Sequence, residues 1–429
     1  MAEGIQLIVA NRLEHLADAL AGLMQTTSSD ETVDPLSPET IMVQSKGMQR
    51  WLSLTLADRN GICANVEFPF PNAFLASVYQ LLGGQLPRSD PFDTDMLAFR
   101  IFSLLPELTN DLLFKPLKSY LVNGPNPVKA FQLAKKIAET FDQYFVYRPE
   151  LLLAWERDDA APSDHPAAGW QSALWRRLAG EIVTPHRARL HGDLVRRLAD
   201  TEHLPAEFPR RLAIFGVSYL PPVYLQILQA LGHRIPVYLF LLNPCREFWF
   251  DIVSEKQIAR IRSHANPSGK GAARHPETDL HLESGNSLIA SLGKLGRHFF
   301  NQVYQFDCEI SDHFQVQGGN SLLAGIQQDI LLLKESSPRE AAQADGSIRI
   351  HACHSAMREI EVLHDQLLDI FEEYPHIQPR DVMVLTPDIS AYAPYIHAVF
   401  GSAGLIPFSV ADLRYLGRVS LIEALQDFI

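Results

Sequence analysis

One short stretch of the chain, residues 44–50, carries side chains that could bind nucleic acid. Its amide, hydroxyl and cationic groups belong to Gln44, Ser45, Lys46 and Arg50. If a helix begins here, its free backbone N–H groups add to the two cations, and the helix start becomes a site for a phosphate group. Gln and Arg side chains can also read base edges. The alternative is that Ser45 only caps the helix and that both cations are solvated surface residues.

The first strand and helix of the chain lack the groups that hold a nucleotide. An apolar strand at 5–9 and an amphipathic helix at 13–24 are joined by residues 10–13, which read Ala-Asn-Arg-Leu. A P-loop enzyme needs GxxxxGK[ST] here, because glycines let the backbone approach the phosphates and the lysine neutralises them. The strand at 212–215 is followed by Gly-Val-Ser, without the carboxylate that would hold Mg²⁺. We therefore expect no catalysis by this chain and no nucleotide cofactor.

Other combinations of reactive side chains have simpler explanations. His351, Cys353 and His354 could suggest a metal site, but neighbours on a strand point to opposite faces and no second ligand pair lies nearby. Asp381 and Asp388 flank an apolar stretch and could suggest a nuclease site. However, the stretch is not followed by an acidic residue, any residue and a lysine, the pattern that a metal-dependent nuclease site of this type needs. We predict neither a metal site nor a nuclease site.

The composition is that of a globular protein with two or three domains. The 429 residues carry a net charge of -13, which argues against a surface that coats nucleic acid or anionic membranes throughout. A local basic groove remains possible, because charges more than about 8 Å apart in solvent are largely screened. The four cysteines form no CxxC motif, and no signal peptide or membrane span is apparent. These features predict a cytoplasmic protein that does not associate with membranes.

Apolar strands that alternate with amphipathic helices predict an α/β fold with a parallel sheet covered on both faces. The expected strands span residues 5–9, 41–43, 212–215 and 237–242. Ser45 should cap the second helix, and Pro221-Pro222 should open a later one. Residues 74–208 have an almost wholly helical pattern, which we interpret as an insertion between core segments 1–73 and 209–337 of a first domain spanning 1–340. Residues 263–286 read as an exposed loop.

A second α/β domain is expected to begin after a polar linker at 336–346 and to span 347–429. Strands at 348–351 and 382–385 and helices at 358–373 and 392–400 support this prediction. The sequence ends at 421–429 within a helical pattern that has no stop signal, so we expect a fragment of a longer protein.

Several blocks of residues, in order along the whole chain, resemble the RecC family, the gamma subunits of the bacterial helicase-nuclease RecBCD (exodeoxyribonuclease V). Each block alone is a weak signal, whereas the ordered set is specific. The blocks are Asn11-Arg12-Leu13, Val43 to Met48 with Trp51-Leu52, Phe141 to Tyr144 with Tyr147-Arg148-Pro149, Leu220 to Leu225, Gly293 to Arg297, and His354-Ser355 with Arg358 to Asp365.

The resemblance implies a superfamily 1 helicase-like fold, in which a RecA-like domain has lost its ATPase and kept a channel for single-stranded DNA. Members of this family are understood to guide the 3′-ended strand, to scan it for the Chi sequence and to scaffold RecB and RecD during repair of double-strand breaks by homologous recombination. Single-stranded DNA and RecB-like and RecD-like subunits are therefore the expected partners.

The resemblance also favours particular DNA-binding residues. In superfamily 1 helicases the loop after the second strand touches the single strand, which favours the DNA-binding interpretation of residues 44–50. Phe70 could provide a stacking platform for bases, although the turn at 68–72 could instead direct both of its phenylalanines into the core. The full set of predicted contacts is Gln44, Ser45, Lys46, Arg50, Phe70, Asp142, Gln143, Arg148 and Arg187. Asp142 and Arg148 could equally form an ordinary ion pair.

Two other functions remain open at this point. One is an ATP-dependent helicase or nuclease subunit with an atypical nucleotide site, which a nucleotide titration would detect. The other is a pure protein-interaction scaffold, which would not bind DNA.

Overall fold

The chain forms two compact units, which are described separately below. The computed structural model describes residues 4–28, 37–87, 89–121, 126–157, 167–252, 285–306, 308–316, 318–335 and 345–411. The first unit comprises residues 1–320 and 324–340, and the second comprises residues 321–323 and 341–429.

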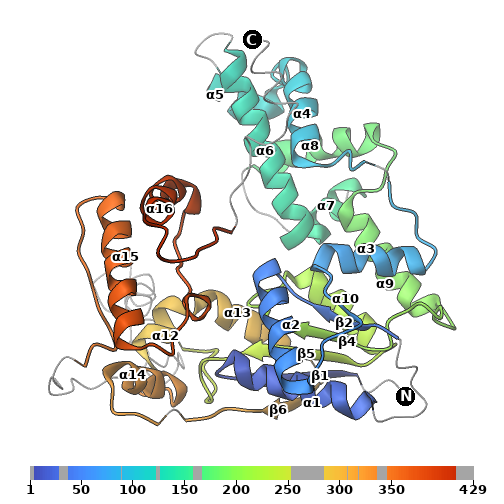
Figure 1. Cartoon of the computed structure of the whole chain (residues 1–429). Coiled ribbons are helices and arrows are strands. Elements are labelled where there is room, and N and C mark those ends of the chain that lie inside the picture. The colour runs from blue at the N-terminus through green and yellow to red at the C-terminus, as the bar shows by residue number, and fades with distance from the viewer. Residues whose placement is uncertain are drawn as a thin grey trace, which may run out of the picture. The chain divides into compact units, whose positions relative to one another are not determined.

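The first unit is built on a six-stranded sheet in which every pair of neighbours is parallel (Figure 1). The strand order is β3-β2-β4-β5-β1-β6. The strands are β1 (Ile5–Ala10), β2 (Glu39–Met42), β3 (Val66–Glu67), β4 (Leu212–Phe215), β5 (Val237–Leu242) and β6 (Cys308–Asp312). Strand β6 and the two-residue strand β3 are therefore the edges of the sheet.

The central strands are buried on both faces because nearly all of their side chains are apolar. In β1, Leu7 and Val9 belong to one hydrophobic cluster and Ile8 belongs to another on the opposite face. Leu7 is aligned with Leu239 of β5 on one side and with Ile310 of β6 on the other. This alternation between two apolar faces is what a parallel sheet covered by helices requires.

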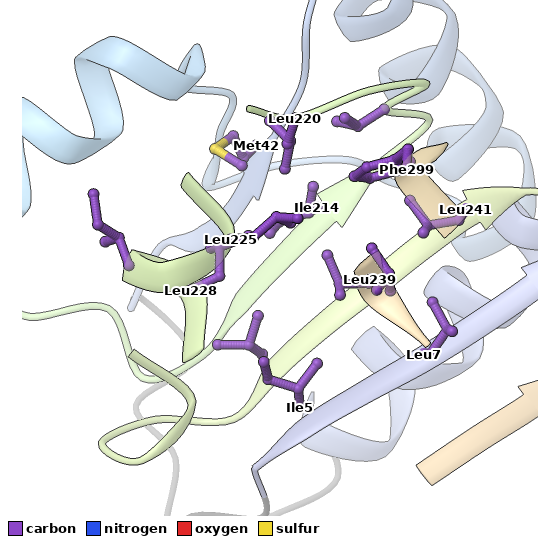
Figure 2. Packing of buried hydrophobic residues seen from close by; sticks show 14 of the residues in the cluster. Ile5, Leu7, Met42, Ile214, Leu220, Leu225, Leu228, Leu239, Leu241 and Phe299 are labelled. Atoms are coloured by element: carbon purple, nitrogen blue, oxygen red, sulfur yellow. The ribbon is translucent and has the colours of Figure 1, made fainter. Parts of the chain in front are cut away.

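Helices cover both faces of the sheet. One face packs against α1 (Leu13–Ser28) and α2 (Lys46–Asn60). The other face packs against helices α3, α9, α10, α12 and α13, and Figure 2 shows side chains of this cluster, among them Leu225 and Leu228 near Ile214. These helices are α3 (Pro71–Leu81), α9 (Arg187–Asp200), α10 (Pro222–Gly232), α12 (Ser287–Leu292) and α13 (Lys294–Val303). A further helix of the chain is α14 (Leu322–Leu331).

The helices between α3 and α9 enclose a second hydrophobic core. Its largest side chains include Trp175, Phe92, Phe141 and Phe145, each at most 1% exposed. The Trp175 ring lies 5.4 to 5.6 Å from each of the three phenylalanine rings. The helices are α4 (Thr94–Leu108), the 3-10 helix η1 (Leu112–Phe114), α5 (Lys115–Leu121), α6 (Pro127–Tyr147), α7 (Pro149–Glu156) and α8 (Ala168–Glu181).

A buried carboxylate joins three of these helices. Glu156, at the end of α7, accepts hydrogen bonds from the indole of Trp175 at 3.1 Å and from the guanidinium of Arg189 at 2.7 Å, and it lies 2.5 Å from Nε2 of His186. The side chains of Glu156 and His186 are only 8% and 1% exposed. Burial acts to raise the pKa of the Glu156 carboxyl, but the hydrogen bonds and charges of His186 and Arg189 outweigh this effect and hold the pKa below its ordinary value.

The second unit contains helices α15 (Ala356–Glu373) and α16 (Ile389–Ala403) and the 3-10 helix η3 (Pro379–Asp381). Ile360, Leu367 and Phe400 belong to its small core. The strands predicted at 348–351 and 382–385 are wrong, because neither stretch is a strand in the structure. A strand needs a neighbour for its backbone hydrogen bonds. Neither stretch has such a neighbour among the described residues, and apolar side chains such as Met383 (82% exposed) remain uncovered.

The remaining sequence predictions for the fold have mixed outcomes. The α/β class and the four strands predicted in the first unit are confirmed, with boundaries within two residues. Strands β3 and β6 were not predicted. The linker expected at 336–346, the loop expected at 263–286 and the helix expected at 421–429 lie wholly or mostly outside the described residues. No helix in the described ranges is long and apolar enough to cross a membrane.

Candidate nucleic-acid interface

The carboxyl ends of the parallel strands bring the loops after β1, β2, β4, β5 and β6 to one edge of the sheet, which we call the carboxyl edge. Ligands of open α/β sheets bind at this edge, because the loops and the helix starts that follow the strands converge there. The stretch 44–50 follows β2 and therefore lies at this edge.

The position that a nucleotide-binding loop would occupy, after β1, is closed by a pair of hydrogen bonds. Asn11 donates from Nδ2 to the carbonyl oxygen of Gln315 at 2.8 Å, and its Oδ1 accepts from the backbone N–H of Gln315 at 3.1 Å. Gln315 follows β6, so this pair joins the ends of two neighbouring strands. A cavity of about 260 Å³ beside it is lined by Asn11, Arg12, Pro244 and glutamine and aliphatic side chains, without a lysine or a carboxylate.

The end of β4 carries a glycine where a magnesium-binding carboxylate would be expected in an active motor. Gly216 has a φ angle of +65°, and a Cβ atom added there would lie 3.0 Å from Cε of Met48. The glycine is thus required both by the left-handed backbone and by its contact with the first turns of α2.

Gln44 and Ser45 form the entry to α2. The Ser45 side chain accepts a hydrogen bond from the backbone N–H of Met48 at 3.1 Å, so the predicted cap is confirmed. Gln44 donates from Nε2 to the carbonyl oxygen of Tyr219 at 2.8 Å, which ties the loop after β2 to the loop after β4. The hydroxyl of Ser45 is therefore engaged in capping, whereas Oε1 of Gln44 accepts no hydrogen bond from the described residues.

Lys46 and Arg50 are the free cations of this edge. Both are exposed, and neither makes a hydrogen bond or an ion pair with any residue that the structure describes. They are four positions apart on α2 and so lie on the same side of the helix. Like charges at this spacing are slightly destabilising. Their proximity is therefore not explained by the stability of the helix and suits an anionic ligand.

The two phenylalanines of the turn before α3 have different environments. Phe68 is partly buried against the cluster formed by α1 and α2. Phe70 is 36% exposed and immediately precedes Pro71, the first residue of α3. Phe68 therefore packs into the core, whereas the ring of Phe70 remains partly exposed.

Tyr219 connects the carboxyl edge to the end of α6. Its ring centroid lies 6.3 Å from that of Tyr147, the last residue of α6, and 6.0 Å from that of Phe299 in α13. Arg148 follows Tyr147 directly and lies 3.8 Å from the carboxylate of Glu150. Tyr219 thus contacts Gln44 through its backbone carbonyl and Tyr147, the neighbour of Arg148, through its ring.

The alternative ion pair between Asp142 and Arg148 is wrong. Residues six positions apart face different sides of a helix, whereas ion pairs along a helix need a spacing of three or four. Asp142 instead pairs with Arg187, with 3.0 Å between Oδ1 and the guanidinium, and Asp90 approaches the same guanidinium at 3.1 Å. Gln143, next to Asp142, is exposed and has no hydrogen-bond partner in the described part of the chain.

A cavity of about 320 Å³ lies beside Arg187, between α3 and α9. Its wall is mainly apolar, with Leu75, Leu190 and Leu194, and it also includes His191. Burial, together with the positive charge of Arg187, lowers the pKa of His191 to about 4. The imidazole is therefore neutral at physiological pH and can both donate and accept a hydrogen bond.

Sequence reasoning missed several residues of this region. No sequence pattern pointed to Asp90, because its partner Arg187 lies 97 positions away. Tyr219 could have been noticed from its place just after a buried strand, where parallel sheets position ligand contacts. Within the described ranges, no group of three or more His, Cys, Asp and Glu side chains is arranged to hold a metal ion.

Comparisons with known proteins agree with the resemblance noted in the sequence. The RecBCD enzyme subunits RecC of Escherichia coli and Haemophilus influenzae are each 36% identical to the chain, in alignments that cover 97% and 94% of it. The subunit of Mycolicibacterium smegmatis is 30% identical over 93% of the chain. The chain spans 34% to 40% of the length of these three relatives. The family model "RecC, N-terminal domain" matches residues 5–333, and the chain therefore belongs to the RecC N-terminal domain family.

Proposed function

We propose that the chain is a non-catalytic, superfamily 1 helicase-like part of a RecBCD-type complex, and that it guides single-stranded DNA along the carboxyl edge of its sheet. In the complete complex this path would carry the 3′-ended strand and present it for Chi scanning. The chain would also scaffold RecB-like and RecD-like subunits, in the cytoplasm, during repair of double-strand breaks by homologous recombination.

The main support is the pair of cations Lys46 and Arg50, which have no partner among the described residues, near a loop after β1 that is tied to the loop after β6. A motor would keep the position after β1 open for phosphates, whereas here Asn11 and Gln315 bind each other across it. The cations one turn apart on α2 would contact phosphates of a strand that passes over this edge. Gln44 and Gln143 have polar atoms without a partner in the described part of the chain, and these atoms could contact bases.

The test is the double variant Lys46→Ala/Arg50→Ala. Each lost phosphate contact lowers the salt slope of single-strand binding by about 0.7, so the slope should fall by about 1.4 and the affinity by roughly 25-fold at 0.1 M salt. Fluorescence anisotropy with a labelled single strand at several salt concentrations measures both quantities. The control Arg59→Ala/Arg210→Ala removes the same charge from the end of α2 and from the bend two residues before β4, at the opposite edge of the sheet. An equal loss in both double variants would show that only the total charge matters and would refute the proposed path.

The pairing of Asp142 with Arg187 gives a second prediction, in which the affinity for a single strand should rise rather than fall. In Asp142→Asn, Arg187 loses one of its two carboxylate partners and becomes more available to phosphate. Because half-exposed ion pairs contribute at most about 1 kcal/mol, we expect the affinity for a single strand to rise about two- to fivefold. Asp200→Asn, which removes the same charge at the far end of α9, should have no effect. A fall in affinity would instead mean that Asp142 itself contacts the DNA.

A further inference from the structure

Three aromatic rings lead from the core of the first unit to its surface near the carboxyl edge. Phe299 of α13 is buried, Tyr219 after β4 is partly buried, and Tyr147 at the end of α6 is 51% exposed. The ring centroids of Phe299 and Tyr219 lie 6.0 Å apart, and those of Tyr219 and Tyr147 lie 6.3 Å apart. The exposed ring of Tyr147 is therefore supported by a ring that itself packs against the core.

The exposure of Tyr147 contributes little to the stability of the fold. Half of the side chain remains in solvent, and its hydroxyl makes no hydrogen bond with any residue that the structure describes. Burial and the nearby Tyr147 raise the pKa of Tyr219, so the hydroxyl of Tyr219 stays uncharged near neutral pH and does not repel phosphate. The pair thus offers an apolar face and neutral polar groups to a ligand.

The surroundings of Tyr147 carry polar groups without partners. Gln143 lies four positions earlier on α6, so it faces the same side of the helix, and it is exposed. On the other side of the pair, Gln44 donates to the carbonyl oxygen of Tyr219 at 2.8 Å. Only two residues, at most about 7 Å of chain, separate Gln44 from Lys46. A strand that stacks on Tyr147 and continues past Tyr219 would therefore meet the amide of Gln44 and then the cations of α2.

This combination suits an unpaired nucleotide better than a duplex or a protein. Proteins that hold single strands combine cations along the backbone with aromatic faces on which bases stack. A duplex keeps its bases inside and could use only the cations. The core of a protein interface is apolar, whereas the exposed residues close in sequence to the two tyrosines, Gln143, Arg148 and Ser218, are polar or charged.

We propose that Tyr147, supported by Tyr219, is a stacking platform for an unpaired base of the single strand. The proposal rests on the proposed path along the carboxyl edge, and it adds a contact with the face of a base to the contacts with base edges and phosphates. Every base has a π face, so stacking accepts any of them. The platform should therefore strengthen binding of all sequences and should not by itself select one.

The test is Tyr147→Ala, followed by fluorescence anisotropy with a labelled single strand at several salt concentrations. Loss of one stacking contact should weaken binding by at least about fivefold. Because no phosphate contact is lost, the salt slope should not change. Lys46→Ala/Arg50→Ala should show the other signature, a slope lower by about 1.4. Tyr147→Phe keeps the ring and should bind as the unsubstituted chain does.

A second probe separates stacking from a structural role of the ring. The probe is a strand of the same length that keeps its sugars and phosphates but has no bases. At low salt, Tyr147→Ala should bind this abasic strand as tightly as the unsubstituted chain does. An equal loss with both probes would overturn the proposal, because the ring would then act through the shape of the protein and not through a base.

Tyr120→Ala is the matched control. Tyr120 is also 51% exposed, but it lies on α5, which Figure 1 shows at the end of the insertion remote from the sheet. This variant should leave the binding of both probes unchanged. A loss equal to that of Tyr147→Ala would overturn the proposal.

The results distinguish the platform from the path on which it rests. A change below about twofold in Tyr147→Ala, with a lower slope in Lys46→Ala/Arg50→Ala, would refute the platform and leave the path intact. A loss in Tyr147→Ala with an unchanged slope in the cation variant would refute the phosphate contacts and support the platform. A loss in Tyr147→Phe as large as that in Tyr147→Ala would overturn stacking in favour of a hydrogen bond from the hydroxyl. Absence of single-strand binding by the unsubstituted chain at low salt would overturn both proposals.

Discussion

Glu156→Gln is expected to lower the free energy of unfolding by about 2 to 4 kcal/mol, although the side chain keeps its size. Removing one partner of a buried ion pair leaves the others uncompensated, which typically costs about 3 to 5 kcal/mol. His186 is almost fully buried and Trp175 is buried with it, so both lose the carboxylate acceptor in the interior. Arg189 is half exposed and can turn to water, which reduces the cost.

The same variant should change how stability depends on pH. The folded structure holds the pKa of Glu156 below its ordinary value, so its contribution is complete above the unfolded pKa of about 4.3 and is lost as the pH falls through the folded pKa. The difference between the two proteins should therefore be largest near neutral pH and should shrink on acidification below about pH 4. Urea unfolding followed by tryptophan fluorescence at several pH values measures it. Glu150→Gln, at an exposed ion pair, should change stability by less than about 0.5 kcal/mol; a comparable loss there would contradict the special role of burial.

Gly216→Val is expected to destabilise the first unit by about 2 to 4 kcal/mol. The residue adopts a φ angle of +65°, a conformation that costs residues with a Cβ atom about 1 to 2 kcal/mol and is worse for a β-branched side chain. In addition, the new side chain would displace Met48, whose Cε would lie 3.0 Å from the added Cβ. Because Met48 lies two residues after Lys46, single-strand binding should weaken together with stability.

A second glycine gives a control of opposite sign. Gly22 lies within α1, and a Cβ atom added there would meet nothing within 4 Å. Gly22→Ala should raise the free energy of unfolding by about 0.5 to 1 kcal/mol, because alanine loses less backbone entropy in a helix. Thermal and urea unfolding of both variants provide the comparison. An unchanged midpoint in Gly216→Val would contradict the left-handed conformation of that residue.

The sheet could be predicted from the sequence only where strands are buried. Strands β4 and β5 are continuous apolar runs and β1 is apolar except for Gln6, and all three were predicted. Strand β6 reads Cys-Glu-Ile-Ser-Asp and is largely exposed, so no apolar run indicates it. The reverse error occurs at 382–385, where the run Val-Met-Val-Leu looks like a buried strand. Hydrophobicity alone does not tell whether a neighbouring strand exists to pair with it.

The candidate site shows a similar limit. The cap formed by Ser45 was predictable, because a serine three residues before its N–H partner is a local pattern. The roles of Arg187 and Gln44 were not, because their partners Asp90 and Tyr219 lie 97 and 175 positions away. Local patterns thus located the helix start at which Lys46 and Arg50 stand, and tertiary structure decided which neighbouring charges are already neutralised. Whether those cations contact DNA stays a prediction.

The two edges of the sheet bear on the solubility of this chain. An open edge strand offers unpaired backbone groups to other molecules and invites edge-to-edge aggregation. Strand β3 has only two residues, which is too short to template another strand. Strand β6 is longer and exposes Ile310, but Glu309 and Asp312 are also exposed on it. A second copy that paired with this edge would bring like charges together. The polar side chains that make β6 difficult to recognise from the sequence therefore also discourage self-association.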